Sequence, residues 1–464
     1  MKRWVSVSVV CLISGVVWAE RPDLTGMVVT SDESALEGTT VYIWTASVKE
    51  GTSPFCPSCY ADCGKKSVTD EEGRFTIPSL DPTLRFKVLA VKEGYLPTFA
   101  DKVDPAEGET MIVLGEIPED RLAPDHSVVG RVVDAEGWPV VGAIIEPFGR
   151  KTARGARYGT MPNAGVDPLA VTNDQGEFVL TSDVTNATFY AHVYARNFAT
   201  KNVHTLTTGG DDHVVTMDRG VTVTGQVRDN GTGFKGVEMG MVQTDRGAHT
   251  FLGDYSVGVF DSGFFELPNM PADLDYSIYG IMASLQGKGA IPVRTIRTGA
   301  NGEQMEVEPF DIVRGVSISG QVVLSDGAAI PPKTRLLIWR DDAPDSLFCE
   351  LDEAGRFSAS YLPPGPYELH IRVDGYRLSE KNYSLDPDQK SYMLGLFTSN
   401  NDDLTILLEP GRPNPTNTRA MDVGSGLHSR EEIERWQKLQ SQIRRVFERR
   451  KKLRNEEIRG WEKE

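Results

Sequence analysis

Three cysteines lie close together near residue 60, where they offer the most distinctive chemistry in the sequence. Cys56, Cys59 and Cys63 fall within eight residues, and the surrounding loop contains no histidine. In an exported protein the simplest interpretation is a disulfide between two of them, with the third thiol left over. Cys349 stands in an apolar, strand-like stretch, so we expect it to be a buried side chain.

Two other interpretations of this cysteine loop stay open. Cys-x-x-Cys is a common zinc pair, and three thiolates would leave one place in a four-ligand site for Asp62, a distant residue or a second chain. A thiol redox centre would use Cys56 and Cys59, with Lys65 and Lys66 lowering one thiol pKa. No thioredoxin-like strand-helix-strand pattern surrounds them. Beyond this possible zinc site, we expect no cofactor.

The usual signatures of enzymes are missing from the sequence. None of the seven histidines belongs to a His-Glu-x-x-His or His-x-x-x-His motif, so a zinc peptidase has no visible ligands. Gly424-Ser425-Gly426 lacks the spacing of the Gly-x-Ser-x-Gly motif that presents a nucleophilic serine. These observations predict a non-catalytic protein.

Two further patterns are better explained as turns. Residues 231–236 match Gly-x-Gly-x-x-Gly, but a strand-like stretch follows where nucleotide binding requires a helix. Asp211-Asp212 and residues 400–403 could hold Ca²⁺ between modules, yet their spacing does not match a calcium loop. Both acidic stretches come directly before an expected strand, where turn residues are common.

Composition and charge exclude several classes of protein. The chain has 464 residues and a formal net charge of −17, which is the wrong sign for binding nucleic acid by neutralising phosphates. Its apolar content is that of a folding chain. The charge is uneven, because residues 20–429 carry −23 and residues 430–464 carry +4.

The first 19 residues have the three parts of a secretory signal. Lys2 and Arg3 precede an apolar middle, and the small residue Ala19 stands at the expected cleavage site. We therefore expect export to the periplasm, the cell surface or the medium. No other stretch is apolar for the ~20 residues that a membrane span needs, so we expect no transmembrane segment.

The rest of the chain repeats one unit four times. Glycines in the middle of strand-like stretches recur at spacings of 104, 95 and 95 residues, at Gly26, Gly130, Gly225 and Gly320. Further along each unit, a turn rich in acidic residues and glycine leads to an aromatic residue: Phe75, Phe178, Phe265 and Phe357. Aromatic-led alternating stretches follow these turns. Short strands of this kind predict antiparallel β-sandwiches in series, with one buried and one wet face per strand.

The repeats resemble the carboxypeptidase regulatory-like modules, small sandwiches with a transthyretin-like or Ig-like fold that are grouped with carbohydrate-binding-like folds. The third repeat is the most divergent, and the resemblance is carried by residues 91–95, 130–134, 137–143, 172–178, 362–369 and 373–376. It implies the fold of residues 22–411. It implies no single function, because such modules accompany peptidases, receptors and adhesins alike.

We therefore predict an all-β protein of four tandem antiparallel β-sandwiches followed by a C-terminal amphipathic α-helix. The predicted parts are a signal peptide (1–19), a first repeat with the cysteine insertion (22–121), a second (125–219), a third (220–315) and a fourth repeat (316–411), a linker (412–428) and a basic helix (429–464).

The predicted helix begins at Ser429 with a Ser-x-x-Glu capping box. A narrow apolar stripe runs along it between many arginines and lysines, formed by Ile433, Trp436, Ile443 and Phe447. Such a helix cannot bury itself. We expect it to dock on the acidic body, to self-associate as a short coiled coil, or to lie on an anionic surface.

The function expected from these observations is binding without catalysis, with a glycan or another cell-envelope component as the ligand implied by the family resemblance. Trp138 and Tyr158 are aromatic residues that could stack on sugars. One alternative is an extracytoplasmic spacer or scaffold that contacts its partner through the helix or the cysteine loop. A second alternative is a metal or redox centre in that loop.

Overall fold

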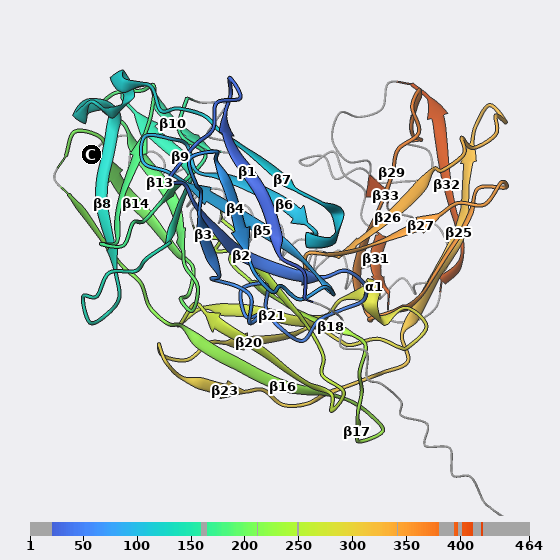
Figure 1. Ribbon diagram of the computed structural model, residues 1–464. Helices are drawn as coiled ribbons and strands as arrows, with labels where there is room; N and C mark the ends of the chain where they lie inside the picture. The colour runs from blue at the N-terminus through green and yellow to red at the C-terminus, as the bar shows by residue number, and fades with distance from the viewer. Residues whose placement is uncertain are drawn as a thin grey trace, which may run out of the picture. The chain divides into compact units, whose positions relative to one another are not determined.

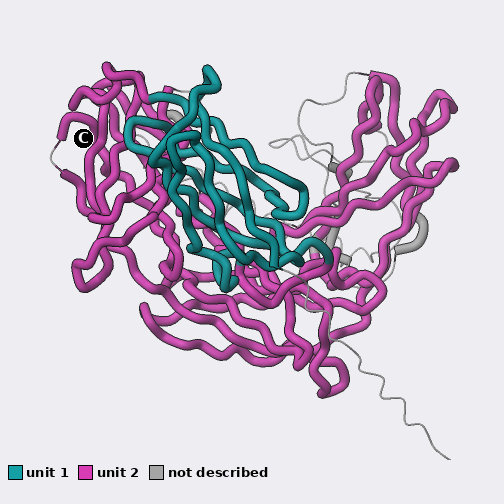
Figure 2. Tube along the Cα trace, viewed as in Figure 1, with its two compact units in different colours: residues 1–50, 57–116 teal, residues 51–56, 117–464 magenta. Residues whose placement is uncertain are grey.

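The computed structural model describes residues 21–158, 165–210, 212–247, 250–340, 342–379, 394–397, 401–411 and 419–420. The predicted signal peptide, the predicted C-terminal helix and most of the predicted linker lie outside these residues. The chain divides into two compact units, residues 1–50 with 57–116 and residues 51–56 with 117–464 (Figure 2). The boundaries of the four repeats stay a prediction.

The first unit contains two facing sheets, with strand orders β4-β1-β7 and β3-β2-β5-β6 (Figure 1). Phe75, Phe86 and Val28 pack together in the core of this unit. The elements are β1 (Leu24–Thr30), β2 (Thr40–Val48), β3 (Lys66–Val68), β4 (Arg74–Ile77), β5 (Leu84–Val91), β6 (Thr98–Val103), the 3₁₀ helix η1 (Pro105–Glu107) and β7 (Thr110–Leu114).

The second repeat forms the sheets β12-β8-β15 and β10-β9-β13-β14, with β11 pairing β9, around its own apolar core. Its elements are the 3₁₀ helices η2 (Glu119–Leu122) and η3 (Pro124–His126), then β8 (Ser127–Val133), β9 (Ile144–Thr152), β10 (Gly155–Tyr158), β11 (Ala170–Val171), β12 (Glu177–Thr181), β13 (Thr188–Tyr194), β14 (Lys201–Thr207) and β15 (His213–Thr216).

The third repeat forms the sheets β17-β16-β20, with β23 and β24 also pairing β16, and β19-β18-β21-β22, again around a separate core. Its elements are β16 (Val221–Asp229), β17 (Thr232–Gly233), β18 (Glu238–Gln243), β19 (Asp254–Gly258), β20 (Phe264–Met270), β21 (Asp275–Gly280), the helix α1 (Met282–Leu285), β22 (Arg294–Arg297), β23 (Gln304–Glu306) and β24 (Phe310–Asp311).

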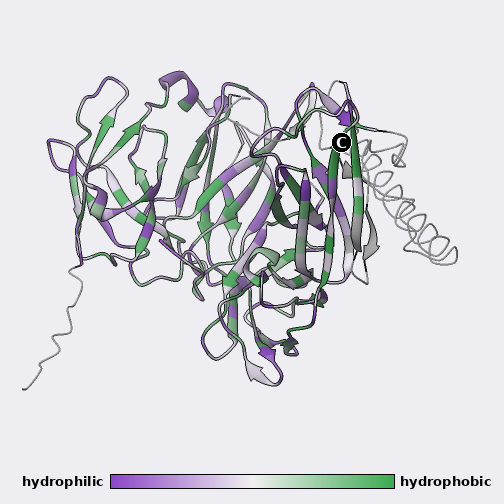
Figure 3. Cartoon of the chain, turned by 90° about the vertical axis from the view of Figure 1, so that its right-hand side faces the viewer, coloured by the Kyte–Doolittle hydropathy of each residue, from purple (hydrophilic) through white to green (hydrophobic). Residues whose placement is uncertain are grey.

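The fourth repeat forms the sheets β28-β25-β32-β30 and β27-β26-β29-β31, with β33 pairing β29. Its elements are β25 (Val316–Leu324), β26 (Arg335–Arg340), β27 (Asp345–Glu350), β28 (Arg356–Leu362), β29 (Gly365–Ile371), β30 (Tyr376–Leu378), β31 (Leu394–Phe397), β32 (Asn401–Pro410) and β33 (Arg419–Ala420). Along the strands of the chain, hydrophobic and hydrophilic residues alternate (Figure 3).

The recurring glycine and the recurring phenylalanine of each repeat are cross-strand partners. Gly26 lies opposite Phe75, and the other three pairs are Gly130 with Phe178, Gly225 with Phe265 and Gly320 with Phe357. A Cβ at position 26 would lie 2.6 Å from the Phe75 ring and 2.2 Å from the Thr110 carbonyl oxygen. The glycine is therefore needed because the aromatic ring lies across the neighbouring backbone.

The expectation of purely antiparallel sandwiches is wrong in one respect. In each repeat the first strand pairs in parallel with a late strand, as β1 does with β7, β8 with β15, β16 with β23 and β25 with β32. A parallel pair needs a long crossover, and here the remaining strands of the repeat supply it. Local sequence patterns do not report such a pairing.

The expectation of one wet face per strand is also wrong for β21. Only its first residue, Asp275, is exposed. Ser277 and Tyr279, on the face away from the core of the third repeat, are buried like the residues that face that core. Tyr279 packs with Val242 and with Ala343 of the fourth repeat. The next repeat therefore covers a surface that an isolated module would expose to water.

Two segments expected to be irregular contain strands. Arg419 and Ala420, in the predicted linker, form β33 and pair with His370 and Leu369. Asn401 to Asp403 belong to β32 rather than to the turn before it. In contrast, residues 231–236 form the expected turn, since β17 folds back on β16 before β18 begins.

Candidate binding site

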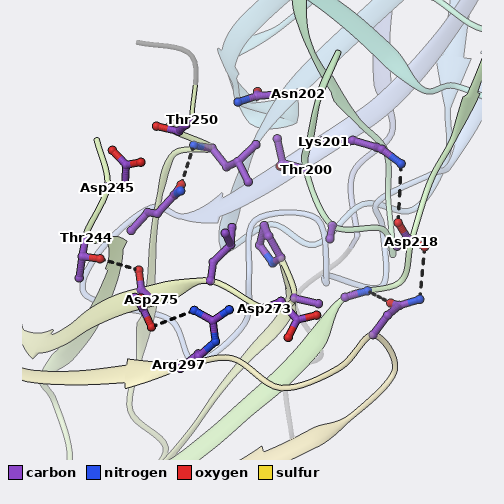
Figure 4. A pocket seen from close by; sticks show the side chains of 18 residues that line it. Thr200, Lys201, Asn202, Asp218, Thr244, Asp245, Thr250, Asp273, Asp275 and Arg297 are labelled. Atoms are coloured by element: carbon purple, nitrogen blue, oxygen red, sulfur yellow. Dashed lines mark hydrogen bonds and ion pairs between the residues drawn. The ribbon is translucent and has the colours of Figure 1, made fainter. Parts of the chain in front are cut away.

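A pocket of about 680 Å³ lies in the second unit, where the second and third repeats meet (Figure 4). The second repeat contributes residues 199–202 at the start of β14 and the connection 218–220. The third repeat contributes the end of β18 with residues of the loop after it, residues 271–275 from the turn between β20 and β21 to the start of β21, Arg297 at the end of β22, and Asn301. Pockets of ligand-binding size commonly form at such junctions between modules.

The connection between the two repeats is short and tightly held. Gly220 has a φ of 77°, and a Cβ there would lie 2.5 Å from the Met270 carbonyl oxygen, so only glycine fits without strain. Its amide donates to Asn301 Oδ1 at 2.7 Å. Asn269 Nδ2 donates to the Arg219 carbonyl at 2.8 Å. These bonds fix one wall of the pocket.

Another part of the lining is the turn that carries Asp273 and Asp275. Thr298 is buried, and its hydroxyl donates to the Pro271 carbonyl at 2.8 Å and accepts from the Leu274 amide at 3.0 Å. Asp273 has a left-handed φ of 57°, which Asp tolerates better than most residues. The two carboxylates are thus positioned by a turn whose backbone is hydrogen-bonded to the buried Thr298 hydroxyl.

Charged groups line the pocket in two separate clusters. On the second repeat, Lys201 Nζ lies 3.8 Å from Asp218 Oδ2, and Asn301 Nδ2 donates to Asp218 Oδ1 at 3.3 Å. On the third repeat, Arg297 Nη1 lies 3.3 Å from Asp275 Oδ1. Both ion pairs are partly open to solvent (Figure 4). Their groups therefore remain accessible to a ligand.

The lining as a whole carries more negative than positive charge. Asp218, Asp245, Asp273 and Asp275 stand against Lys201 and Arg297, with further hydrogen-bonding groups from Asn202, Thr200, Thr244 and Thr250. The side chains that line it include no aromatic ring. This arrangement can bind a polar molecule through many hydrogen bonds, and its net charge disfavours an anionic ligand.

The cysteine loop has a different chemistry from the pocket. Cys56 and Cys59 are disulfide-bonded, while Cys63 is buried and belongs to no disulfide, with its Sγ 3.4 Å from the Pro57 carbonyl oxygen. Neighbouring Asp62 is buried and pairs with Arg21 and Lys65, each at 2.8 Å. A sulfur in a disulfide is no thiolate ligand, and the described residues contain no cluster suited to a metal ion.

Cys349, His192 and His370 lie in strands. Cys349 is buried in β27, and burial raises its pKa to about 11. His192 in β13 stacks on Phe148 with ring centroids 4.3 Å apart, and its Nδ1 lies 2.6 Å from Asn202 Oδ1. Burial lowers its pKa. His370 in β29 has its Nε2 3.4 Å from Glu368 Oε2.

The two aromatic residues considered for sugar stacking have unequal access. Tyr158 stacks on Tyr190 with centroids 5.6 Å apart, so one face of its ring is occupied. Trp138 is 71% exposed, in a turn whose backbone is held by Asp134 Oδ1. The structure does not bring either residue into the pocket lining.

The residues of the pocket were not predicted from the sequence. They come from positions 199 to 301, and each belongs to a loop or strand end that is unremarkable by itself. One signal was present, because the second repeat is predicted to end at 219 and the third to begin at 220. With no linker between them, the loops at that end of each module must meet.

No helix in the described part of the chain is both long and apolar enough to cross a membrane. No family model matches the chain, and no curated protein matches it. Parts of the chain are similar to solved structures of bacterial proteins. GBS52, the minor pilin of Streptococcus agalactiae, is 14% identical, with coverage of 42% of this chain and 98% of that one and a TM-score of 0.23.

Two other solved structures show a similar level of likeness. The Bacillus anthracis TIE protein is 12% identical over 84% of this chain and 73% of its own, with a TM-score of 0.17. BcpA, the major pilin subunit of Bacillus cereus, is 11% identical over 63% of this chain and 99% of its own, with a TM-score of 0.18. TM-scores of this size carry no inference about function.

Proposed function

We propose that this chain is an exported, non-catalytic binding protein of the cell envelope, whose pocket between the second and third repeats binds a hydroxyl-rich ligand such as a glycan. The observation that carries the proposal is the lining itself, in which four carboxylates, two cations and several amides and hydroxyls converge on one space of about 680 Å³. The volume lies within the ~300–1,000 Å³ usual for small-ligand sites.

The chemistry of the lining favours a neutral sugar or an amino sugar. A carboxylate accepts hydrogen bonds from neighbouring hydroxyls, while Lys201, Arg297 and Asn202 offer donors. A phosphorylated or sulfated glycan would meet the net negative charge of the lining. Because no aromatic ring lines the pocket, we expect recognition through hydrogen bonds rather than stacking.

A glycan array probed with the chain lacking residues 1–19 tests this proposal. We expect signal on neutral or amino sugars, and loss of most of that signal in Asp273→Asn, which keeps the size of the side chain and suits its left-handed backbone. The matched control is Asp261→Asn, an exposed carboxylate of the same repeat outside the pocket lining. Equal signal from both variants would contradict the proposal.

A second candidate function, a rigid spacer or scaffold, is favoured by the way the repeats of the second unit are joined. Gly220 links the second repeat to Asn301 of the third, and the Met282 amide of the third repeat donates to Asp345 Oδ2 of the fourth at 2.8 Å. A fluorescence distance measurement between Val214→Cys and Glu350→Cys tests it. A single narrow distance supports the spacer, and a broad distribution contradicts it.

In this proposal the cysteine loop is a disulfide-closed structural loop rather than a metal or redox centre. The pairing of the buried Asp62 with the partly exposed Arg21 and Lys65 supports it, because Asp62 is then engaged in holding the loop to the chain beside it. Metal analysis and a thiol count on the exported protein test this. Stoichiometric zinc, or three free thiols among residues 56–63, would contradict it.

A further inference from the structure

One face of the fourth repeat is suited to receive another part of the chain. It belongs to the sheet of β27, β26 and β29, on the side away from the core. Between β26 and β27, the register places Leu337 opposite Phe348 and Arg335 opposite Glu350. Between β26 and β29, it places Trp339 opposite Glu368. Phe348 is 60% exposed, which is uncommon for a phenylalanine on a sheet of this size.

This face combines apolar and charged side chains. Leu337 and Trp339 are half-buried; Leu337 lies opposite Phe348 and Trp339 two residues further along β26, so the three form an apolar band. The guanidinium of Arg335 lies 5.3 Å from the centroid of the Phe348 ring. Glu350, opposite Arg335, adds an exposed carboxylate at the end of the face, whereas Glu368 is buried. A segment with a narrow apolar stripe matches such a surface in hydrophobicity, and Glu350 offers its basic residues a carboxylate.

The path of the chain limits which segment can reach this face. β33 pairs with β29, so Arg419 and Ala420 extend the very sheet that carries the apolar band. Residues 421–428 follow, and the segment that begins at Ser429 is joined to β33 by a connection of at most about 30 Å when fully extended. The start of this segment is therefore confined to the neighbourhood of β29.

The sequence of that segment fits the face. Its apolar residues follow helical spacing, and its charge is +4. Trp436 and Ile433 stand within the first two turns, which are the turns nearest to the point of attachment. We propose that residues 429–464 of the same chain form an amphipathic helix that docks on the face formed by Leu337, Trp339 and Phe348, with basic residues of the helix toward the exposed carboxylate of Glu350.

Limited trypsin digestion of the chain lacking residues 1–19 tests this docking, because the segment contains 12 lysines and arginines. In the wild type we expect slow cleavage within 430–463. Phe348→Glu removes the apolar contact and places a charge beneath the apolar stripe, where burying it is costly, so the cleavage rate rises about tenfold as the undocked population grows. The matched control, Val214→Glu, changes a valine that is 61% exposed in β15 and leaves the rate unchanged.

A second variant and a cross-linking experiment keep the test decisive if Phe348→Glu fails to fold. Ile443→Asp alters the segment alone and gives the same rise in cleavage. Zero-length cross-linking joins Lys438, Lys451 or Lys452 to Glu350 in wild-type protein, and a mixture of isotope-labelled and unlabelled chains shows that the link lies within one copy. Rapid cleavage of wild-type protein, or links formed only between copies, overturns the proposal.

Discussion

The second unit contains two junctions between repeats, and they are built in opposite ways. At the junction of the second and third repeats, Arg297 and Asp275 form an ion pair whose side chains are 60% and 52% exposed around an open pocket. At the junction of the third and fourth repeats, Val242, Tyr279 and Ala343 form a small buried cluster. Beside it lie Arg340 and Asp345, both buried.

This difference assigns ligand binding to the open junction and stability to the closed junction. Exposed ion pairs contribute little to stability, so the residues around the pocket are free to serve a ligand. A buried charge must be paired to be tolerated, so the closed junction depends on each of its polar groups. We therefore expect substitutions at the closed junction to unfold the protein, and substitutions at the pocket to leave it folded without its ligand.

The largest effect is expected from Arg340→Ala. Arg340 is 1% exposed, donates to Asp342 Oδ1 at 2.9 Å and lies over the Tyr367 ring, 5.5 Å from its centroid. Its removal leaves carboxylates near the junction without their cation, at a cost of about 3–5 kcal/mol. Urea denaturation followed by tyrosine and tryptophan fluorescence measures the loss. An unchanged midpoint would show that the closed junction does not depend on this pair.

A pH-dependent effect is expected at Asp345. Burial raises its pKa to about 6, although the Met282 and Ser346 amides and Arg340 favour the ionised form and Asp342 opposes it. The stabilising effect of protonation is full below the unfolded pKa of 3.8 and is lost as the pH rises through about 6. Between pH 4 and pH 7, the wild type should lose about 2–3 kcal/mol relative to Asp345→Asn. Parallel pH profiles of the two proteins would contradict this.

A smaller loss of stability is expected when a side chain is added at Gly220, in the backbone of the open junction. Gly220→Ala places a Cβ against the Met270 carbonyl in a left-handed conformation and should cost about 1–3 kcal/mol. Gly231→Ala is the matched control, since Gly231 is also left-handed but nothing lies within 4 Å of its Cβ position. Thermal unfolding of the two variants measures the difference. Equal losses would mean that the close contact at the junction adds nothing.

The smallest effect on stability is expected at the pocket itself. Asp275→Asn breaks the exposed pair with Arg297 but leaves the backbone carbonyl of residue 275, which accepts from the Thr244 amide, in place. The change in the free energy of unfolding should stay below about 1 kcal/mol. A larger loss in urea denaturation would mean that the pocket, like the closed junction, is a structural element.

The sequence predicted those parts of the fold that depend on neighbouring residues. The turns before Phe75 and Phe178 and the glycines opposite them were identified correctly, because turn and strand preferences act over a few residues. The parallel pairing of β1 with β7 was missed, since its partners are about 85 residues apart. One face of β21 was wrongly predicted to be exposed to water, because nothing in the sequence of the strand indicates that Ala343 packs against it.

The pocket was harder to predict than the fold for the same reason. Lys201 and Arg297 are almost 100 residues apart, and each looks like an ordinary solvated charge on a strand end. Their approach depends on the angle between two modules, which meet at a connection where the Gly220 amide donates to Asn301. The spacing of the repeats showed that two modules adjoin, but it contained no information about that angle.

The proposed function depends most directly on ligand binding at the open junction. Titration calorimetry with the glycan that gives the strongest array signal measures the affinity of the wild type, Asp275→Asn and Asp261→Asn. Urea denaturation of the same three proteins confirms that each is folded. We predict that Asp275→Asn weakens binding at least about tenfold, corresponding to ~1.4 kcal/mol, while Asp261→Asn binds as the wild type does. Equal affinity for all three proteins would contradict the central claim that this pocket is the binding site.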